Sequence, residues 1–180
     1  GSGTTYTVDV TPTADGAVTV DVAAGVCIDA AGNSNTAATQ FSITYDTTSP
    51  TPIISSSVIS PTNNSTIPIT VTFDESVTGF ESSDITVGNG SLSSFTGSGT
   101  TYTFDVTPTA DGLVTVDIAA GVCTDIAGNS NVAAGQFSIH YFSTIVETWA
   151  KSIGGSNNES VYEMAVDNSG NIYITGTFRG

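Results

Sequence analysis

The amino-acid sequence predicts an all-β protein made of two-sheet sandwiches, and three observations support this prediction. Strand-forming Thr, Val, Ile, Tyr and Phe, together with turn-forming Gly, Ser, Asn and Asp, dominate the 180 residues, whereas leucine occurs only twice. Apolar and polar side chains alternate over several short segments. Residues 1–45 also recur almost unchanged at residues 97–141. Because strictly alternating strands bury one face each, two sheets must pack face to face.

The individual strands follow from the alternation within residues 46–141. Strict alternation covers 66–73, 101–107, 113–118 and 136–141, and shorter candidate strands lie at 52–59, 84–88 and 91–96. Turn signals such as Asn89-Gly90 and Asp111-Gly112 separate them. Seven short strands in about 96 residues predict an immunoglobulin-like β-sandwich. The side chains that we expect to face its core are Ile67, Ile69, Val71, Phe73, Tyr102, Phe104, Val106, Val114, Val116, Ile118, Phe137, Ile139 and Tyr141.

The repeat defines the domain organisation. Its two copies differ at eight of 45 aligned positions and are offset by 96 residues. We therefore expect a complete domain at 46–141, which begins with the proline-containing joint 46–52, and the C-terminal half of a preceding domain at 1–45. Residues 142–148 are interpreted as a linker and residues 149–180 as part of a different repeat. The chain is accordingly expected to be an excerpt from a longer tandem array.

The last forty residues follow a different pattern. Residues 161–167 and 171–178 are expected to be two strands, joined by a hairpin turn at Asn168-Ser169-Gly170. One such unit cannot bury its own face, so we expect an isolated hairpin here.

Two stretches resemble known families. Residues 73–95, FDESVTGFESSDITVGNGSLSSF, followed by YTFDVTPTADGLVTVDIAAGV and DIAGNSN, resemble the bacterial Ig-like repeats of large surface and secreted proteins. This resemblance covers residues 1–141 and implies a tandem extracellular array that serves as a stalk or adhesive module. Cys27 and Cys123 depart from the pattern, which has a small residue there. Residues 149–180 resemble the bacterial β-propeller repeat, which implies the start of a truncated propeller blade.

The charge distribution argues against two classes of partner. Lys151 and Arg179 are the only basic residues, so residues 1–148 carry eleven Asp and three Glu with no Lys or Arg. Because cations are needed to neutralise phosphates, we expect neither nucleic acid nor an anionic membrane as partner. No apolar run approaches the ~18 residues of a membrane span. The acidity fits a soluble extracellular chain, which is either self-repelling or partly neutralised by divalent cations.

The sequence offers few residues for catalysis, and we expect no enzyme. His140, the only histidine, falls on the outward face of its strand, so that no Ser-His-Asp or Cys-His arrangement can be assembled. Cys27 and Cys123 occupy equivalent positions and cannot pair within one domain. They are expected to be small buried hydrophobic residues, and no nearby Lys or Arg is present to lower a thiol pKa.

Calcium is the one cofactor that the sequence suggests. The loop AGVCTDIAGNSN at 120–131 offers Asp125, Asn129 and Asn131, and its copy at 24–35 offers Asp29, Asn33 and Asn35. Asp and Asn oxygens are ligands that calcium prefers, and Asp46 of the joint is expected to lie near this loop. The alternative is a turn without a ligand, since Asp forms Asx-turns and Gly-Asn tolerates left-handed backbone. The spacing is not that of an EF-hand, and both interpretations stay open.

The sequence thus predicts a non-enzymatic stalk or spacer of a large bacterial cell-surface or secreted protein. Its expected partners are the neighbouring Ig-like and propeller domains of the same chain. Two alternatives stay open: a module that binds a surface or carbohydrate ligand, and accessory domains of a secreted hydrolase. Sugar sites usually expose aromatic rings, and only Trp149 and a few tyrosines are left without a structural role, which favours the spacer.

Overall fold

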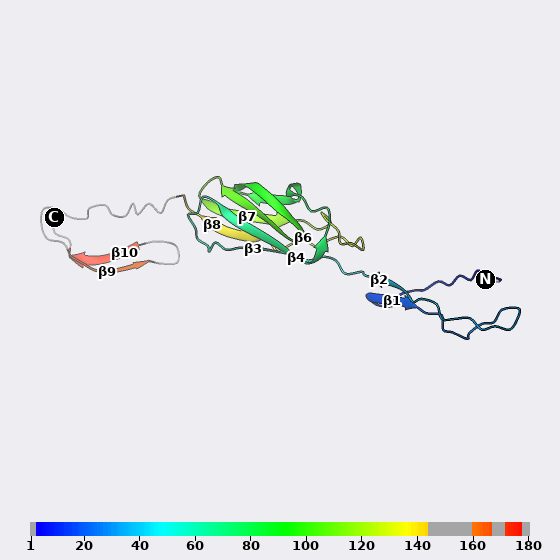
Figure 1. The fold of residues 1–180 in the computed structure, drawn as a ribbon. Coiled ribbons are helices and arrows are strands. Elements are labelled where there is room, and N and C mark those ends of the chain that lie inside the picture. The colour runs from blue at the N-terminus through cyan, green and yellow to red at the C-terminus, as the bar shows by residue number, and fades with distance from the viewer. Residues whose placement is uncertain (1–2, 144–159, 167–171, 178–180) are drawn as a thin grey trace. The chain divides into compact units, whose positions relative to one another are not determined.

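The computed structural model describes residues 3–143, 160–166 and 172–177. The chain divides into two compact units, Gly1–Ser143 and Thr144–Gly180, each of which is considered by itself. The described residues form β-strands and loops apart from one short 3-10 helix, η1 (Ser82–Asp84), as Figure 1 shows. None of them belongs to a helix that is long and apolar enough to cross a membrane.

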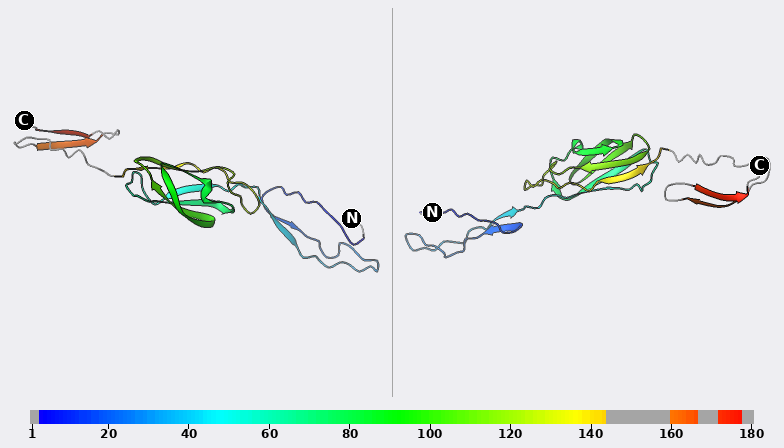
Figure 2. Two further views of the ribbon diagram at one scale, coloured as in Figure 1. Left: turned by 90° about the horizontal axis from the view of Figure 1, so that it is seen from above. Right: turned by 180° about the vertical axis from the view of Figure 1, so that it is seen from behind.

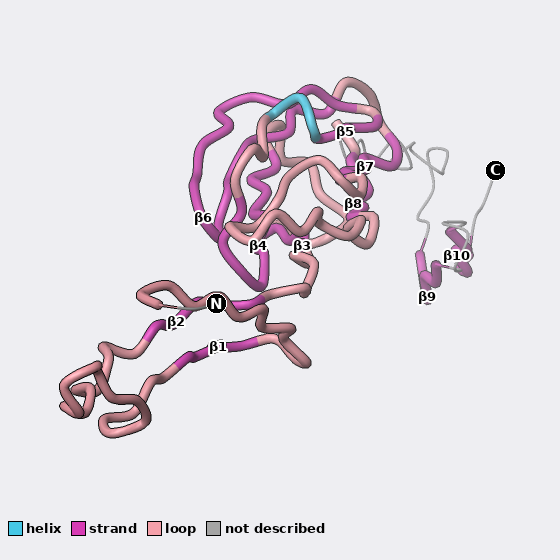
Figure 3. The backbone as a smooth tube through the Cα atoms, turned by 90° about the vertical axis from the view of Figure 1, so that its right-hand side faces the viewer, coloured by secondary structure: helices cyan, strands magenta, loops and turns pink. Residues whose placement is uncertain are grey.

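Residues 46–143, all of which are described, form a sandwich of two antiparallel three-stranded sheets (Figure 3). One sheet has the order β3–β4–β6, with β3 at Pro52–Ser56, β4 at Ile67–Val77 and β6 at Gly90–Pro108. The other has the order β5–β7–β8, with β5 at Ile85–Gly88, β7 at Gly112–Ile118 and β8 at Phe137–Tyr141. The all-β sandwich that the alternation predicts is confirmed.

The expected strands at 91–96 and 101–107 need a correction, because both belong to the single 19-residue strand β6. Its two ends are neighbours, since Thr109 N, just beyond one end, donates to Asn89 O, just before the other, over 3.1 Å. The strand must therefore reverse its direction. Gly97 and Gly99, with φ of 141° and 65°, supply backbone conformations that residues with a side chain rarely adopt. The alternation predicts both segments, called the first and second arm of β6 below, but not that they belong to one continuous strand.

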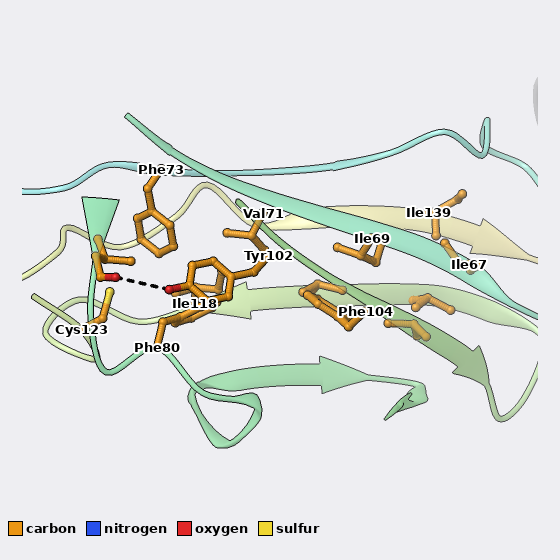
Figure 4. Packing of buried hydrophobic residues seen from close by; sticks show 14 residues of the cluster. Ile67, Ile69, Val71, Phe73, Phe80, Tyr102, Phe104, Ile118, Cys123 and Ile139 are labelled. Atoms are coloured by element: carbon orange, nitrogen blue, oxygen red, sulfur yellow. Dashed lines mark hydrogen bonds between the residues drawn. The ribbon is translucent and has the colours of Figure 1, made fainter. Parts of the chain in front are cut away.

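The core lies between the two sheets and contains most of the side chains that the alternation places inward (Figure 4). Phe137 and Tyr141 are only partly buried against it, and Val77, Phe80 and Cys123, which lie outside the alternating segments, belong to it. Four of the core side chains on β4 are at most 2% exposed: Ile67, Ile69, Val71 and Phe73. Burying each such side chain contributes roughly 1.5–3 kcal/mol. At one end of the core, Phe73, Phe80, Phe95 and Tyr102 form an aromatic cluster with ring centroids 5.0–6.1 Å apart.

Tyr102 shows how a polar atom is accommodated in this core. Its hydroxyl donates to Val77 O over 3.3 Å, drawn as the dashed line in Figure 4. Burial raises the pKa of the Tyr102 hydroxyl, and a smaller effect from Cys123 acts in the same direction. A buried tyrosine normally finds such a partner.

Residues 1–45, called the half unit below, repeat the sequence of the sandwich without its burial. β1 (Gly16–Val20) and β2 (Phe41–Tyr45) pair antiparallel as a two-stranded sheet (Figure 2). Residues 6–11, which correspond to the second arm of β6, form no strand because nothing equivalent to β4 lies beside them. Cys27 is exposed whereas Cys123 is buried, so the expected burial holds for Cys123 and is wrong for Cys27.

In the second unit, β9 (Ser160–Val166) and β10 (Ile172–Thr177) pair antiparallel, as the sequence predicts. The register shifts between Thr175 and Gly176. The expected turn at 168–170 lies outside the described residues, as do Trp149 and most of the expected linker, 144–148. The truncated propeller blade stays a prediction.

The repeat provides an internal control for core packing. Ile139→Ala removes a side chain that is 1% exposed, and we expect it to lower the free energy of unfolding by about 2–5 kcal/mol. Ile43→Ala changes the equivalent residue of the half unit, which is 57% exposed, and should change it by no more than about 0.5 kcal/mol. Urea denaturation of both variants, followed by circular dichroism, measures the difference. Equal effects would contradict the packing described here.

Candidate functional site

The loop between β7 and β8, residues 120–131, is shaped by the side chain of Asn131, which is 2% exposed. Its Oδ1 accepts hydrogen bonds from the backbone N–H groups of Val122 (2.9 Å) and Cys123 (3.0 Å). Its Nδ2 donates to the carbonyl oxygens of Ala119 (2.9 Å) and Val132 (2.7 Å). All four hydrogen-bonding positions of the carboxamide are thereby occupied. Asn131 therefore holds the two sides of the loop together.

Asn35 makes the same four bonds in the half unit. Its Oδ1 accepts from Val26 N (2.9 Å) and Cys27 N (3.1 Å), and its Nδ2 donates to Ala23 O and Thr36 O, both over 2.8 Å. Among the described residues, no opposing sheet covers the half unit. The loop conformation is therefore encoded locally and needs no core beneath it.

Asp125 organises the tip of the same loop and is 4% exposed. Its Oδ1 accepts from Gly128 N (2.6 Å) and Asn129 N (2.8 Å), and its Oδ2 accepts from Asn129 Nδ2 (2.8 Å). Burial alone would raise the pKa of Asp125, but the hydrogen bonds from Asn129 and the loop backbone outweigh it, so that this pKa lies below its ordinary value. Asp125 is thus held as a carboxylate.

Asp29 and Asn33 form the equivalent pair in the half unit. Asp29 Oδ1 accepts from Ala31 N (2.8 Å) and Asn33 N (2.9 Å), and Asn33 Nδ2 donates to Asp29 Oδ2 (2.9 Å). The side-chain hydrogen bond from Asn33 is the main cause of a lowered Asp29 pKa. Both loops therefore present an ionised aspartate.

Asp125 lies in a group of three carboxylates, called the carboxylate cluster below: Asp46, Glu75 and Asp125, each with an oxygen within 4.8 Å of the others. They come from the joint before β3, from the end of β4 and from the loop between β7 and β8. Asn129 Nδ2 also donates to Asp46 O over 3.1 Å, which ties the loop to the joint. Their spacing is close enough for the three carboxylates to hold one cation together.

The pKa of Glu75 shows the electrostatic effect of the carboxylate cluster. Burial raises its pKa, and the negative charges of Asp46, Asp125 and Asp74 raise it further. Because the folded-state pKa exceeds the ordinary one, ionised Glu75 opposes folding at neutral pH, and this penalty disappears as the pH falls below the ordinary value. A divalent cation among the three carboxylates would remove the repulsion without protonation.

The structure places the sequence-predicted ligands in different roles. Asp125 belongs to the carboxylate cluster, Asn129 bonds two of its members through the amide nitrogen, and the Asn131 carboxamide is occupied by loop bonds. Asp46 lies beside the loop, as expected. Sequence reasoning missed Glu75, which follows the alternating part of β4. The Asp74-Glu75 pair at the end of an apolar strand was the available signal.

A family model described as the bacterial Ig-like domain matches residues 46–141, more than half of the chain. The chain belongs to the bacterial Ig-like domain family. A second family model, described as the β-propeller repeat, matches residues 148–177. No curated protein and no solved structure matches the chain.

The potentially reactive groups of the Ig-like domain, His140 and Cys123, do not belong to the carboxylate cluster. His140 is exposed on β8, and its ring stacks on Phe142 with centroids 6.2 Å apart. Cys123 is buried, and this burial, with a smaller effect from Asp84, raises the pKa of its thiol to about 11. A neutral thiol is a poor nucleophile. Bacterial Ig-like domains and propeller repeats are typically non-catalytic modules.

The two asparagines provide a matched test of the loop. Asn131→Ala leaves two N–H groups and two carbonyls of the Ig-like domain without their partner, and we expect it to lower the free energy of unfolding by at least about 2 kcal/mol. Asn35→Ala removes the same bonds in the exposed half unit, so the unfolding transition of residues 46–141 should be unchanged. Urea titration of both variants measures the two free energies of unfolding. A transition that is unaffected by Asn131→Ala would contradict the role of this side chain.

Proposed function

We propose that the chain is a non-enzymatic spacer of a large bacterial cell-surface or secreted protein, which keeps the domains on either side of it apart. Its partners are the neighbouring Ig-like and propeller domains of the same polypeptide. The extracellular location is part of the proposal, and it is supported by the two family matches and by the absence of Lys and Arg from residues 1–148.

The observation that carries the proposal is the path of the chain through the sandwich. Residues leading into β3 enter at one end, and β8 leaves at the other end (Figure 1). The hydrogen-bond pattern agrees, because Thr51 bonds Asp74 at the end of the apolar part of β4, whereas the residue after β8, Phe142, bonds Thr62. A domain that is entered and left at opposite ends lengthens a tandem array with each copy.

Carbohydrate binding by the sandwich, the alternative of a different class, finds less support. Within residues 46–143, the large aromatic side chain that is exposed is Phe142, at 42%, and it stacks on His140. A sugar site normally uses rings with a free face, supported by convergent polar groups.

Adding a second copy of residues 46–141 directly after Tyr141 tests the spacer role. The maximum dimension in small-angle X-ray scattering should increase by roughly 35 Å, the length of an eleven-residue strand such as β4. An antibody against this domain should also bind intact cells or culture medium of the source bacterium. Binding only after cell lysis, or a dimension that does not grow, would contradict the spacer.

Calcium at the carboxylate cluster is the second part of the proposal. Its support is the meeting of three carboxylates from the joint, β4 and the loop, with ionised Asp125 among them. Hard cations such as calcium take several carboxylate and carbonyl oxygens. Because Asp46 belongs to the joint, a bound ion would fix the joint against the sandwich.

Thermal denaturation with calcium and with chelator tests this part. Calcium at about 100 times its dissociation constant should stabilise the protein by about 2.7 kcal/mol. Glu75→Gln should raise the melting temperature in chelator, because it removes repulsion within the cluster, and should abolish the increase that calcium causes. Asp105→Asn removes one charge elsewhere in the sandwich and should leave the calcium effect intact. A calcium effect that survives Glu75→Gln would contradict the site.

A further inference from the structure

The half unit exposes an apolar face that the sandwich buries at equivalent positions. Tyr6, Val8 and Ile43 are 73%, 75% and 57% exposed. Their counterparts Tyr102, Phe104 and Ile139 are 5%, 2% and 1% exposed. Val8 and Ile43, with other apolar side chains of the half unit, line an open groove of about 540 Å³. Soluble proteins seldom leave a continuous apolar groove without an occupant.

The internal repeat shows what kind of segment covers such a face. In the sandwich, residues 97–141, the back half, are covered by residues 46–96, the front half. On β4 of the front half, Ile67 pairs with Val106, Ile69 with Phe104 and Val71 with Tyr102. On β5, Ile85 pairs with Ile118 and Val87 with Val116. The half unit carries the counterparts of all these back-half residues: Tyr6, Val8, Val10, Val20 and Val22.

The backbone of the half unit is open at the same places. β7 bonds β8 on one edge and β5 on the other, whereas its counterpart β1 bonds only β2 among the described residues. Residues 6–11 have no strand beside them. Open edges and an open apolar face occur together, and both match β4 and β5, two of the strands that a front half provides.

A second copy of the chain does not supply a front half for the open face of the half unit. Residues 1–180 hold one front half for two back halves, so copies that exchange front halves leave as many back halves open as before. An exchange of front halves between copies therefore covers no additional back half, and an additional front half would.

We infer that the open face of the half unit is a docking surface for a further front half, a segment like residues 46–96 that is not among the 180 residues. It docks in the register of the sandwich, with its counterpart of β4 beside residues 6–10 and its counterpart of β5 beside β1. The loop at 24–35 already has its final hydrogen bonds, so docking mainly orders residues 6–11 and buries the apolar face.

The two cysteines provide the readout. Cys27 is exposed and Cys123 is buried, so one thiol of the folded 180-residue chain should react with a thiol reagent at pH 8. When a copy of residues 46–96 is joined directly to Gly1, the junction reproduces Thr96-Gly97 of the sandwich. In this extended chain, Cys27 should become protected and its labelling rate should fall at least about tenfold. Ile43→Ala should then lower the urea midpoint, as Ile139→Ala does.

A matched extension carries Ile69→Asp and Val71→Asp in the added copy only, which places charges on its covering face. It should leave Cys27 as reactive as in the 180-residue chain. Four outcomes would overturn the inference: unchanged labelling of Cys27 in the extended chain, labelling of both cysteines there, equal protection by the charged extension, or a 180-residue dimer in which Cys27 is already protected. None of these readouts involves calcium or cellular location, so the inference can fail independently of the proposed function.

Discussion

Burial of the apolar face of β4 is the interaction on which the rest of the sandwich depends. β4 is the middle strand of its sheet, and its inward side chains cover both the strands beside it and the sheet opposite. The chain contains its own comparison. Residues 1–45 have nearly the same sequence as 97–141 but lack a β4, and their core-facing side chains remain in solvent. Local sequence therefore suffices for the pairing of β1 with β2, whereas the second arm of β6 and the burial of its apolar side chains require β4, whose paired residues lie 22 to 39 positions away in the sequence.

The loop between β7 and β8, in contrast, takes its shape from its own residues. Asn131 and Asn35 form the same four hydrogen bonds in the sandwich and in the open half unit, and Asp125 and Asp29 each bond the asparagine four residues further on, so the shape of the loop does not depend on packing. Such a loop can hold Asp125 in place before any other carboxylate arrives. Asp46 and Glu75 reach it only when the joint and β4 have taken their positions, which makes the carboxylate cluster a property of the complete domain.

The sequence predicts the parts of this structure that depend on local pattern. Alternation identified the faces of β4, β7 and β8, and the repeat separated the half unit from the sandwich. The continuity of β6 was missed, because the reversal at Gly97 and Gly99 resembles a loop between two strands. Glu75 was missed because its neighbours in space are 29 and 50 residues away in sequence. The exposure of Cys27 was missed because the repeat implied burial without supplying the segment that buries it.

The two back halves are similar but not interchangeable in shape. Of their eight differences, two fall at buried positions of the sandwich, where Phe104 and Ile118 correspond to Val8 and Val22. Both replacements remove volume from the half unit, and interiors tolerate little unfilled space. A front half with bulkier side chains above Val8 and Val22 would fit there better than residues 46–96 do. If the proposed front half docks there, this difference in side-chain volume favours its pairing with the half unit over pairing of the half unit with residues 46–96 during folding.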